Sequence, residues 1–197
     1  MKIVNRRDLE FVLFELLDAE ALTARPRFAD HSRETFLAAL DTAEAIAAEK
    51  FASHNRKADE HEPQFDGLRV SMIPEVKEAL KAFIDAGFMA AAHDYDLGGM
   101  QLPVTMTQAC FSLFKGANVS TSGYPFLTIG NANVIRRFGS AAQQEKYLKP
   151  LLAGRFFGTM ALTEPQAGSS LSDITTRAEP NPDGSYSITG NKIFISA

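Results

Sequence analysis

The spacing of apolar residues changes once along this chain of 197 residues, near Gly154. From Asp8 to about Leu152 the apolar residues recur three and four positions apart, which is the spacing of an amphipathic helix. After Gly154 the apolar runs are short, rich in β-branched and aromatic residues, and separated by turn residues, which is typical of strands. The sequence therefore predicts a mainly α fold, in which an N-terminal helical bundle domain of residues 1–155 is followed by an antiparallel β-domain of residues 156–197.

Local signals predict six helices before Gly154, most of them joined by short loops. Pro74 suits the first position of one helix, and Gly87 suits its end. Ser140 with Gln143 three residues later forms a capping box, which satisfies two backbone N–H groups at the start of another helix.

Two segments of this helical region are expected to be loops. The polar stretch at 52–73 contains Pro63 and Gly67 and predicts a long exposed loop. One helix is expected to stop near Gly116 and the next to span 126–138, with hydroxyl-rich residues between them.

Four strands are expected in the β-domain, and a Pro182-Asp183-Gly184 turn joins the second to the third. A sheet this small would leave strand edges unpaired and one apolar face uncovered. The β-domain is therefore expected to be truncated, with missing layers supplied by further chain or by another polypeptide. The predicted strands lie at 156–162, 174–179, 185–189 and 192–195.

Charge and cysteine content exclude several classes of function. The net charge is −4, from 20 Lys and Arg against 24 Asp and Glu, so no basic face favours nucleic acid or an anionic membrane. No apolar stretch approaches the roughly 20 residues of a membrane span, so no membrane insertion is expected. The single cysteine, Cys110, cannot form an internal disulfide or a multi-thiolate metal site, and it is expected in the helical core. A cytoplasmic location is expected.

The segment that follows the first predicted strand carries the most chemistry. Thr163-Glu164-Pro165 ends the apolar run, and Gly168-Ser169-Ser170 then offers flexible backbone and two hydroxyls with little side-chain bulk. A loop of this kind can bring backbone N–H groups close to a phosphate.

Three features in order resemble the acyl-CoA dehydrogenase family. They are FGSAAQQEKYLKPLLAGRFF at 138–157, MALTEPQAGS at 160–169 and GNKIFIS at 190–196. They are similar to the helix that leads into the family's middle domain, to its flavin-binding loop and to the strand that closes over the flavin ring. The resemblance implies an FAD-dependent oxidoreductase of fatty acid metabolism that introduces a double bond between Cα and Cβ of an acyl-CoA thioester.

The resemblance also implies roles for individual residues. Met160 and Leu162 would line the flavin ring, and Thr163 would hydrogen-bond to it. A flavin needs such an apolar platform together with a few donors that stabilise charge on its reduced form. The positions carried over as cofactor-binding are Met160, Leu162, Thr163, Gly168, Ser169, Phe194, Ile195 and Ser196.

The remaining carried-over positions include two departures from the family's common pattern. Ser169 would lie where the flavin phosphate and the acyl-CoA approach, which makes it the one expected substrate contact. Phe194 would pack on the ring where the family commonly has tryptophan, and Ser196 would place its hydroxyl near the reactive flavin nitrogen. Ser170 stands where an acidic residue is usual. Phenylalanine still stacks and serine still donates, so the roles persist while the substrate subfamily stays open.

Each assignment has a purely structural alternative. Thr163 before Glu164-Pro165 could simply end a strand, and the loop at 168–170 could be an ordinary solvent-exposed loop. Phe194 could be an ordinary core aromatic residue.

The resemblance places the family's catalytic glutamate, which removes the α-proton of the thioester, in a C-terminal helical bundle. Nothing in these 197 residues corresponds to that bundle, so no catalytic residue is assigned, and Glu164 is attributed to the flavin loop. The chain alone is expected to bind flavin poorly and to catalyse nothing. The implied partners are an acyl-CoA substrate, an electron-transferring flavoprotein and further copies of the chain in a homo-oligomer.

Alternatives to this function remain open. The N-terminal helix at 8–15 resembles the branch that includes 3-methylmercaptopropionyl-CoA dehydrogenases, although such a helix can equally be a generic packing element. An acyl-CoA oxidase shares the scaffold and passes electrons to oxygen. A non-catalytic helical interaction or assembly module with a degenerate flavin loop is the alternative outside enzymes.

Other polar groups give weaker signals. The histidines and acids of the 52–73 segment have irregular spacing that matches no metal-ligand scheme, so no metal is expected. His93 next to Asp94 could suggest an acid/base pair, but adjacency in sequence does not direct two side chains to one point. The hydroxyl-rich residues at 116–130 either border an acyl pocket, as in the family, or form a plain loop between helices.

Overall fold

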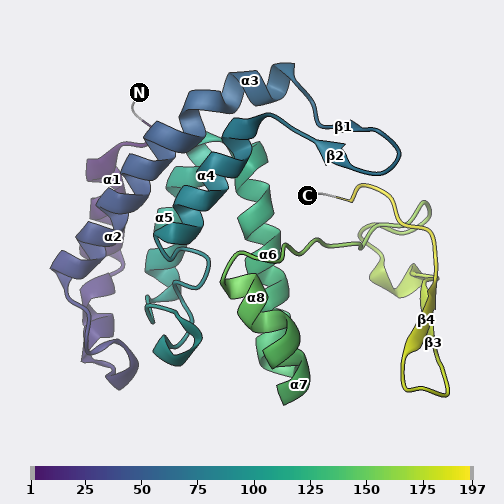
Figure 1. Ribbon diagram of the computed structural model, residues 1–197. Helices are drawn as coiled ribbons and strands as arrows, with labels where there is room; N and C mark the ends of the chain where they lie inside the picture. The colour runs from purple at the N-terminus through teal and green to yellow at the C-terminus, as the bar shows by residue number, and fades with distance from the viewer. Residues whose placement is uncertain (1–2, 196–197) are drawn as a thin grey trace.

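The computed structural model describes residues 3–195, and helices make up the first three quarters of the chain (Figure 1). Two short 3-10 segments, Ala19–Ala24 and Pro26–Phe28, follow the first helix. The six predicted helical runs are present in the described residues, although two of them are longer than expected. They are α1 (Arg6–Glu10) with Phe11–Leu16; α2 (Arg33–Ile46) with Ala47–Phe51, Ala52–His54 and α3 (Asn55–Glu60); α4 (Pro74–Asp85); α5 (Val104–Ala117); α6 (Val119–Phe138); and α7 (Ala141–Gln143) with Gln144–Leu148 and α8 (Lys149–Leu152).

The predicted capping signals are confirmed. Pro74 occupies the start of α4, and Gly87 follows its end with a φ of 79°. The Ser140 hydroxyl accepts a hydrogen bond from the Gln143 backbone N–H, and the Gln143 side chain accepts one from the Ser140 N–H. These signals could be recognised in the sequence because each depends on residues within one helical turn.

The core of the helical part is aromatic. Phe114 of α5 lies at its centre, with its ring centroid 5.0 Å from that of Phe51 and 4.9 Å from that of Phe83. Leu40 and Met106 are fully buried beside this group, and Cys110 is buried as predicted. Such rings bury large apolar areas and add edge-to-face attraction, so α2, α4 and α5 are held in one bundle.

The prediction of a loop throughout 52–73 is wrong for its first part, because the helix of α2 continues to Glu60. His54 lies inside this extension and is buried. Its Nδ1 donates to the Lys50 carbonyl at 2.7 Å, and its Nε2 accepts from the Thr121 hydroxyl at 2.8 Å. A histidine that forms both bonds can be buried without an unsatisfied polar atom. The polar composition of this stretch therefore wrongly predicted that all of it is exposed. Only 61–73 leaves the bundle, with β1 (Gln64–Phe65) and β2 (Val70–Ser71) paired as a short antiparallel hairpin.

The prediction of a loop between Gly116 and residue 126 is also wrong. Asn118 is the single non-helical residue between α5 and α6, and it caps α6 by accepting a hydrogen bond from Thr121 N–H at 2.9 Å. Its amide also donates to the Phe51 carbonyl at 3.2 Å. The hydroxyl-rich segment is therefore helical, and Pro125 is accommodated within α6.

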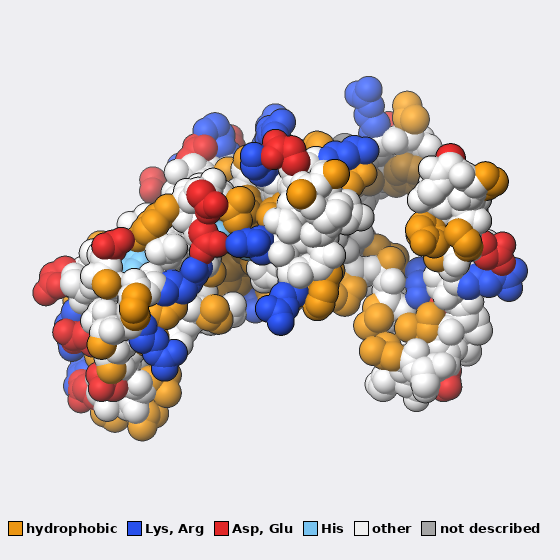
Figure 2. Space-filling view, turned by 90° about the horizontal axis from the view of Figure 1, so that it is seen from below, with side chains coloured by type: hydrophobic (Ala, Val, Ile, Leu, Met, Phe, Trp, Pro, Cys, Tyr) orange, Lys and Arg blue, Asp and Glu red, His pale blue; other side chains and the backbone are white. Residues whose placement is uncertain are grey.

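The C-terminal residues form a smaller part that an extended segment connects to the bundle (Figure 1). β3 (Arg177–Pro180) pairs antiparallel with β4 (Tyr186–Thr189) through the predicted turn, in which Gly184 has a φ of 82°. In Figure 2 this part is the lobe on the right, separated from the helical body by open space over much of its length. The mainly α fold with a small antiparallel sheet is thus confirmed.

Two of the four predicted strands are absent from the described residues. Residues 156–162 and 192–195 are extended or bent backbone without a ladder of paired groups, and only isolated bridging contacts occur near them. A strand exists only through pairing along its length, which neither segment has within residues 3–195. Among the described helices none combines the length and hydropathy that a bilayer crossing requires.

Candidate functional site

The two segments predicted to contact one ligand lie side by side. Ile193 N–H donates to the Thr163 carbonyl at 2.9 Å, and Lys192 Nζ donates to the Leu162 carbonyl at 3.0 Å. Thirty residues separate these segments in sequence, so the contact depends on the intervening hairpin folding back. Sequence analysis expected this proximity, and the structure contains it.

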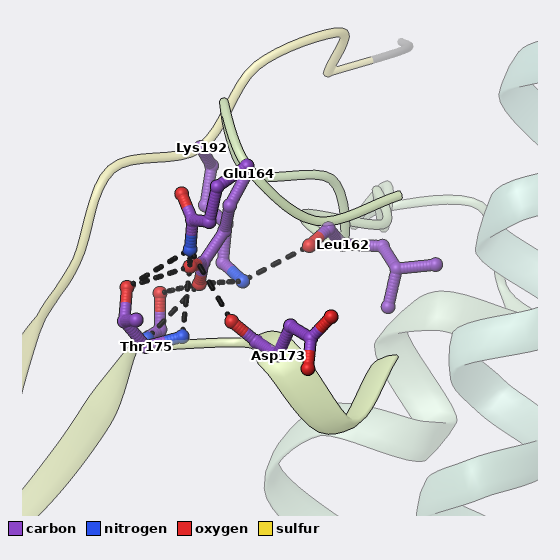
Figure 3. A network of polar contacts seen from close by, with 7 residues as sticks. Leu162, Glu164, Asp173, Thr175 and Lys192 are labelled. Atoms are coloured by element: carbon purple, nitrogen blue, oxygen red, sulfur yellow. Dashed lines mark hydrogen bonds and ion pairs between the residues drawn. The ribbon is translucent and has the colours of Figure 1, made fainter. Parts of the chain in front are cut away.

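Glu164 is the centre of a buried polar cluster at this junction, which we call the Glu164 cluster (Figure 3). The residue is only 2% exposed. Its Oε2 accepts from Thr175 N–H at 2.8 Å and from Gln166 Nε2 at 2.7 Å, and its Oε1 accepts from Thr176 N–H at 3.0 Å and from Lys192 Nζ at 2.8 Å. The hydroxyls of both threonines donate as well. The cluster comprises Glu164, Gln166, Thr175, Thr176 and Lys192.

These donors determine the protonation state of Glu164. The Lys192 ammonium, the Thr176 hydroxyl and the Thr175 backbone N–H hold the pKa of the Glu164 carboxyl far below its ordinary value. The carboxylate therefore stays ionised, and its lone pairs are occupied. A proton acceptor needs a free lone pair and a pKa near the working pH, so Glu164 is unsuited to act as a general base.

The loop after Glu164 is a tight turn. Glu164 N–H donates to the Ala167 carbonyl at 2.8 Å, and Ala167 N–H donates back to the Glu164 carbonyl at 3.1 Å. Gly168 then lies beside Thr163, since a Cβ added at Gly168 would meet only Thr163 Cγ2, at 3.9 Å. Within residues 3–195, neither the Thr163 nor the Ser169 hydroxyl has a hydrogen-bond partner. The same holds for the backbone N–H groups of 168–170, so the loop presents several free donors.

Large apolar side chains are exposed next to these donors. Met160 and Phe194 are 57% and 84% exposed, and Leu162 and Ile195 are also in contact with solvent. Figure 2 shows apolar side chains on the side of the C-terminal lobe that faces the helical body. The interpretation of Phe194 as a core aromatic residue is wrong. An apolar surface beside free N–H and O–H donors has the composition of a site for a flat, partly polar ring system.

The backbone at Phe194 explains why 192–195 is not a strand. Phe194 has a φ of 55°, which is uncommon for a bulky residue and interrupts an extended segment. Ser196, the last predicted cofactor contact, lies outside the described residues.

An apolar cavity of about 320 Å³ lies between α5, α6 and the segment 159–160. Phe111 of α5 and Phe126 of α6 form its walls, and Met160 at its edge also belongs to the apolar surface of the site. Leu127 and Gly130 show that part of the hydroxyl-rich 116–130 region faces this cavity, although as helix and not as loop. No acidic or basic side chain lines it among the described residues.

The other polar candidates have structural roles. No group of three or more His, Cys, Asp or Glu in the described part of the chain could hold a metal ion. Asp94 is unsuited to act as an acid or base. It pairs with Arg27 and with Arg136, and these partners lower the pKa of its carboxyl. His93 is buried, and burial is the largest cause of its lowered pKa.

Sequence analysis missed the roles of Lys192, Thr175 and Thr176. A signal for Lys192 was available, since a lysine followed by Ile193, Phe194 and Ile195 needs an acidic partner if its surroundings are buried. The threonine pair gave no such signal, because it was read only as part of a strand.

Comparisons with known proteins identify relatives over most of the chain. A family model described as the acyl-CoA dehydrogenase N-terminal domain matches residues 33–155. The chain is 34% identical over 190 residues to 3-methylmercaptopropionyl-CoA dehydrogenase of Ruegeria pomeroyi, covering 96% of this chain and 32% of that protein. It is 33% identical over 196 residues to the broad-specificity linear acyl-CoA dehydrogenase FadE5 of Mycobacterium tuberculosis, covering 98% of this chain and 32% of that protein.

A solved structure gives the same result. Butyryl-CoA dehydrogenase from Megasphaera elsdenii has a TM-score of 0.67 and 26% sequence identity, over 84% of this chain and 41% of that one. The chain therefore spans about a third of the length of the curated relatives named above.

Proposed function

The chain belongs to the acyl-CoA dehydrogenase family, and from this premise we propose that it forms the N-terminal portion of an FAD-dependent enzyme. In this proposal residues 1–155 are the N-terminal helical domain, and residues 156–197 begin the flavin-binding β-domain. The reaction is α,β-dehydrogenation of an acyl-CoA thioester. The hydrogen bond from Ile193 N–H to the Thr163 carbonyl carries the proposal, because it joins both flavin-contacting segments into one surface.

The donors and the apolar surface described above fit FAD. Met160, Leu162 and Phe194 supply the apolar contact that a flavin ring requires, and Thr163 supplies a free hydroxyl and a free N–H. Ser169 and the neighbouring backbone N–H groups suit a phosphate. Bound FAD supplies the hydride-accepting chemistry of the reaction. Gly168, Ile195 and Ser196 complete the proposed cofactor site.

The proposed acyl site is the cavity between α5 and α6. Its apolar walls can exclude water from a hydrocarbon chain, and Met160 joins it to the proposed flavin surface. Ser169 is the proposed contact for the polar portion of acyl-CoA.

The proton acceptor must come from outside these residues. The carboxylate oxygens of Glu164 already accept hydrogen bonds from the donors of the Glu164 cluster, and the proposed acyl cavity has no acidic lining residue in the described chain. We therefore expect the isolated chain to bind flavin weakly and to be inactive. We expect the active protein to be a cytoplasmic homo-oligomer that passes electrons to an electron-transferring flavoprotein.

The test is anaerobic titration of the complete gene product, loaded with FAD, with a panel of acyl-CoA thioesters. Bleaching of the flavin's visible absorbance by one or more thioesters is the expected result. Absence of bleaching by every thioester, in a protein that retains its flavin, would contradict the proposal. Reoxidation then separates a dehydrogenase from an oxidase, since a dehydrogenase is reoxidised much faster by an electron-transferring flavoprotein than by oxygen.

A further inference from the structure

The Glu164 cluster lies beside the peptide that joins Leu162 to Thr163, because Lys192 bonds both Glu164 and the Leu162 carbonyl. We propose that Glu164 and Lys192 are positioning residues, which fix the peptide between Leu162 and Thr163 so that Thr163 presents its N–H and hydroxyl to the flavin. This inference rests on the proposed function. It concerns residues that do not themselves contact the ring in that proposal.

The burial of the ion pair is the first argument. The Glu164 side chain is 1% exposed and the Lys192 side chain 20%. Removing two charges from water is costly, and a well-packed apolar pair would often stabilise a protein as well or better. A buried ion pair is therefore weak evidence for stability and better evidence for a requirement on geometry.

The orientation of the 162–163 peptide is the second argument. Lys192 Nζ donates both to Glu164 Oε1 and to the Leu162 carbonyl. No cis peptide occurs in the described chain, and in a trans peptide the C=O and N–H point in opposite directions. The ammonium therefore turns the Thr163 N–H away from Lys192, where no acceptor among residues 3–195 engages it.

The neighbouring carbonyl is fixed in the same way. The Thr163 carbonyl accepts from Ile193 N–H, so both carbonyls that flank the Thr163 N–H are occupied. The Thr163 N–H and hydroxyl remain free. Lys192 and Ile193 thus determine which hydrogen-bonding groups of this segment are available to a ligand.

The approach of the final segment depends on a glycine. A Cβ at Gly190 would lie 2.0 Å from Thr176 Oγ1 and 3.0 Å from Thr176 Cα. Real side chains do not approach so closely, so the backbone before Lys192 can pass Thr176 only as glycine. Thr176 N–H also donates to Glu164, so Gly190 lies against a residue of the Glu164 cluster.

The experiment compares Lys192→Met with Lys192→Arg and with Ser140→Ala in the complete gene product. Lys192→Met removes the ammonium at similar length, and Lys192→Arg retains the charge. Ser140→Ala removes a helix cap far from the cluster in sequence and controls for a general loss of stability. Two quantities are measured under conditions in which every variant is folded: the Kd for FAD and the exchange rate of the Ile193 amide hydrogen without FAD.

The expected result is at least a fivefold increase in Kd and at least a tenfold faster Ile193 exchange for Lys192→Met. Lys192→Arg should show smaller increases in the Kd and in the exchange rate than Lys192→Met. Ser140→Ala should leave both quantities within twofold of wild type. A Kd increase below fivefold for folded Lys192→Met would overturn the positioning role while the proposed function stands. If Lys192→Met does not fold, Glu164→Gln, which keeps the side-chain shape, is held to the same criteria.

Failure of the proposed function gives a different result. Wild-type protein that binds no FAD would overturn both the function and the flavin-directed part of this inference. Unchanged Ile193 exchange in Lys192→Met would overturn the structural part, whether or not FAD binds.

Discussion

Ile193 N–H donates to the Thr163 carbonyl at 2.9 Å, and this bond joins two segments that lie thirty residues apart. On one side are Met160 and Leu162, and on the other is Phe194, all exposed apolar residues. Without the bond these residues would belong to separate loops. With it the two segments lie side by side, next to the free donors of Thr163.

Replacing Thr163 by valine should weaken FAD binding without unfolding the protein. The substitution keeps the shape and removes one hydroxyl that has no partner in the described chain. Loss of one ligand hydrogen bond costs about 1 kcal/mol, or about fivefold in Kd. Fluorescence titration of the complete gene product measures the effect. Thr42→Val on α2, which removes an exposed hydroxyl bonded only to the Ala38 carbonyl, is the matched control and should leave the Kd unchanged.

Glu164 should make the free energy of unfolding of the protein depend on pH in the acidic range. Its pKa is lowered in the folded state, mainly by Lys192, so its contribution is fully present above the unfolded value of about 4.3 and is lost as pH falls below it. Urea unfolding of wild type and Glu164→Gln should therefore show a difference in free energy that is constant from pH 8 to about pH 5. That difference should shrink at lower pH. A difference that does not change with pH would show that the charge of Glu164 is not the stabilising element.

Cys110 should be unreactive while the protein is folded. The thiol is buried in α5, and burial raises its pKa to about 12, so almost no thiolate exists at pH 8. A chromogenic disulfide reagent should modify the thiol only after urea unfolding. Rapid modification of native protein would mean that this part of the core opens readily.

Substitution of Gly154 by alanine should destabilise the protein more than substitution of Gly184. Both glycines have positive φ, 66° and 82°, but a Cβ at Gly154 would lie 2.4 Å from Ile84 Cδ1, whereas one at Gly184 meets nothing within 4 Å. Backbone strain alone costs about 1 to 2 kcal/mol, and overpacking adds about 1 to 3 kcal/mol. Urea unfolding of both variants measures the difference. Equal losses would mean that Ile84 moves aside at no cost.

The helices could be predicted where their signals were local. Pro74 and the Ser140 and Gln143 pair act within one turn, and both marked real helix starts. The errors occurred where contacts with residues distant in sequence determine the local structure. Asn118 can join α5 directly to α6 because it bonds the Phe51 carbonyl, and His54 can be helical and buried because Thr121 satisfies it. Neither partner is visible from the neighbouring sequence.

The site was predictable in outline and not in its internal bonding. The resemblance of 160–169 and 190–196 to one family correctly indicated that the two segments meet. The Glu164 cluster could not be predicted in the same way, because its donors come from three separate places along the chain, at Gln166, Thr175 and Lys192. The apparent strand at 192–195 failed because the positive φ of Phe194 is not encoded by its alternating pattern.

Amide hydrogen exchange of the complete gene product, with and without FAD, tests the central claim most directly. The account predicts slower exchange on FAD binding in peptides that cover 160–170 and 191–195, and no change in the β1 and β2 hairpin. FAD binding that leaves both segments unprotected and protects residues elsewhere would contradict the assignment of this surface to the flavin.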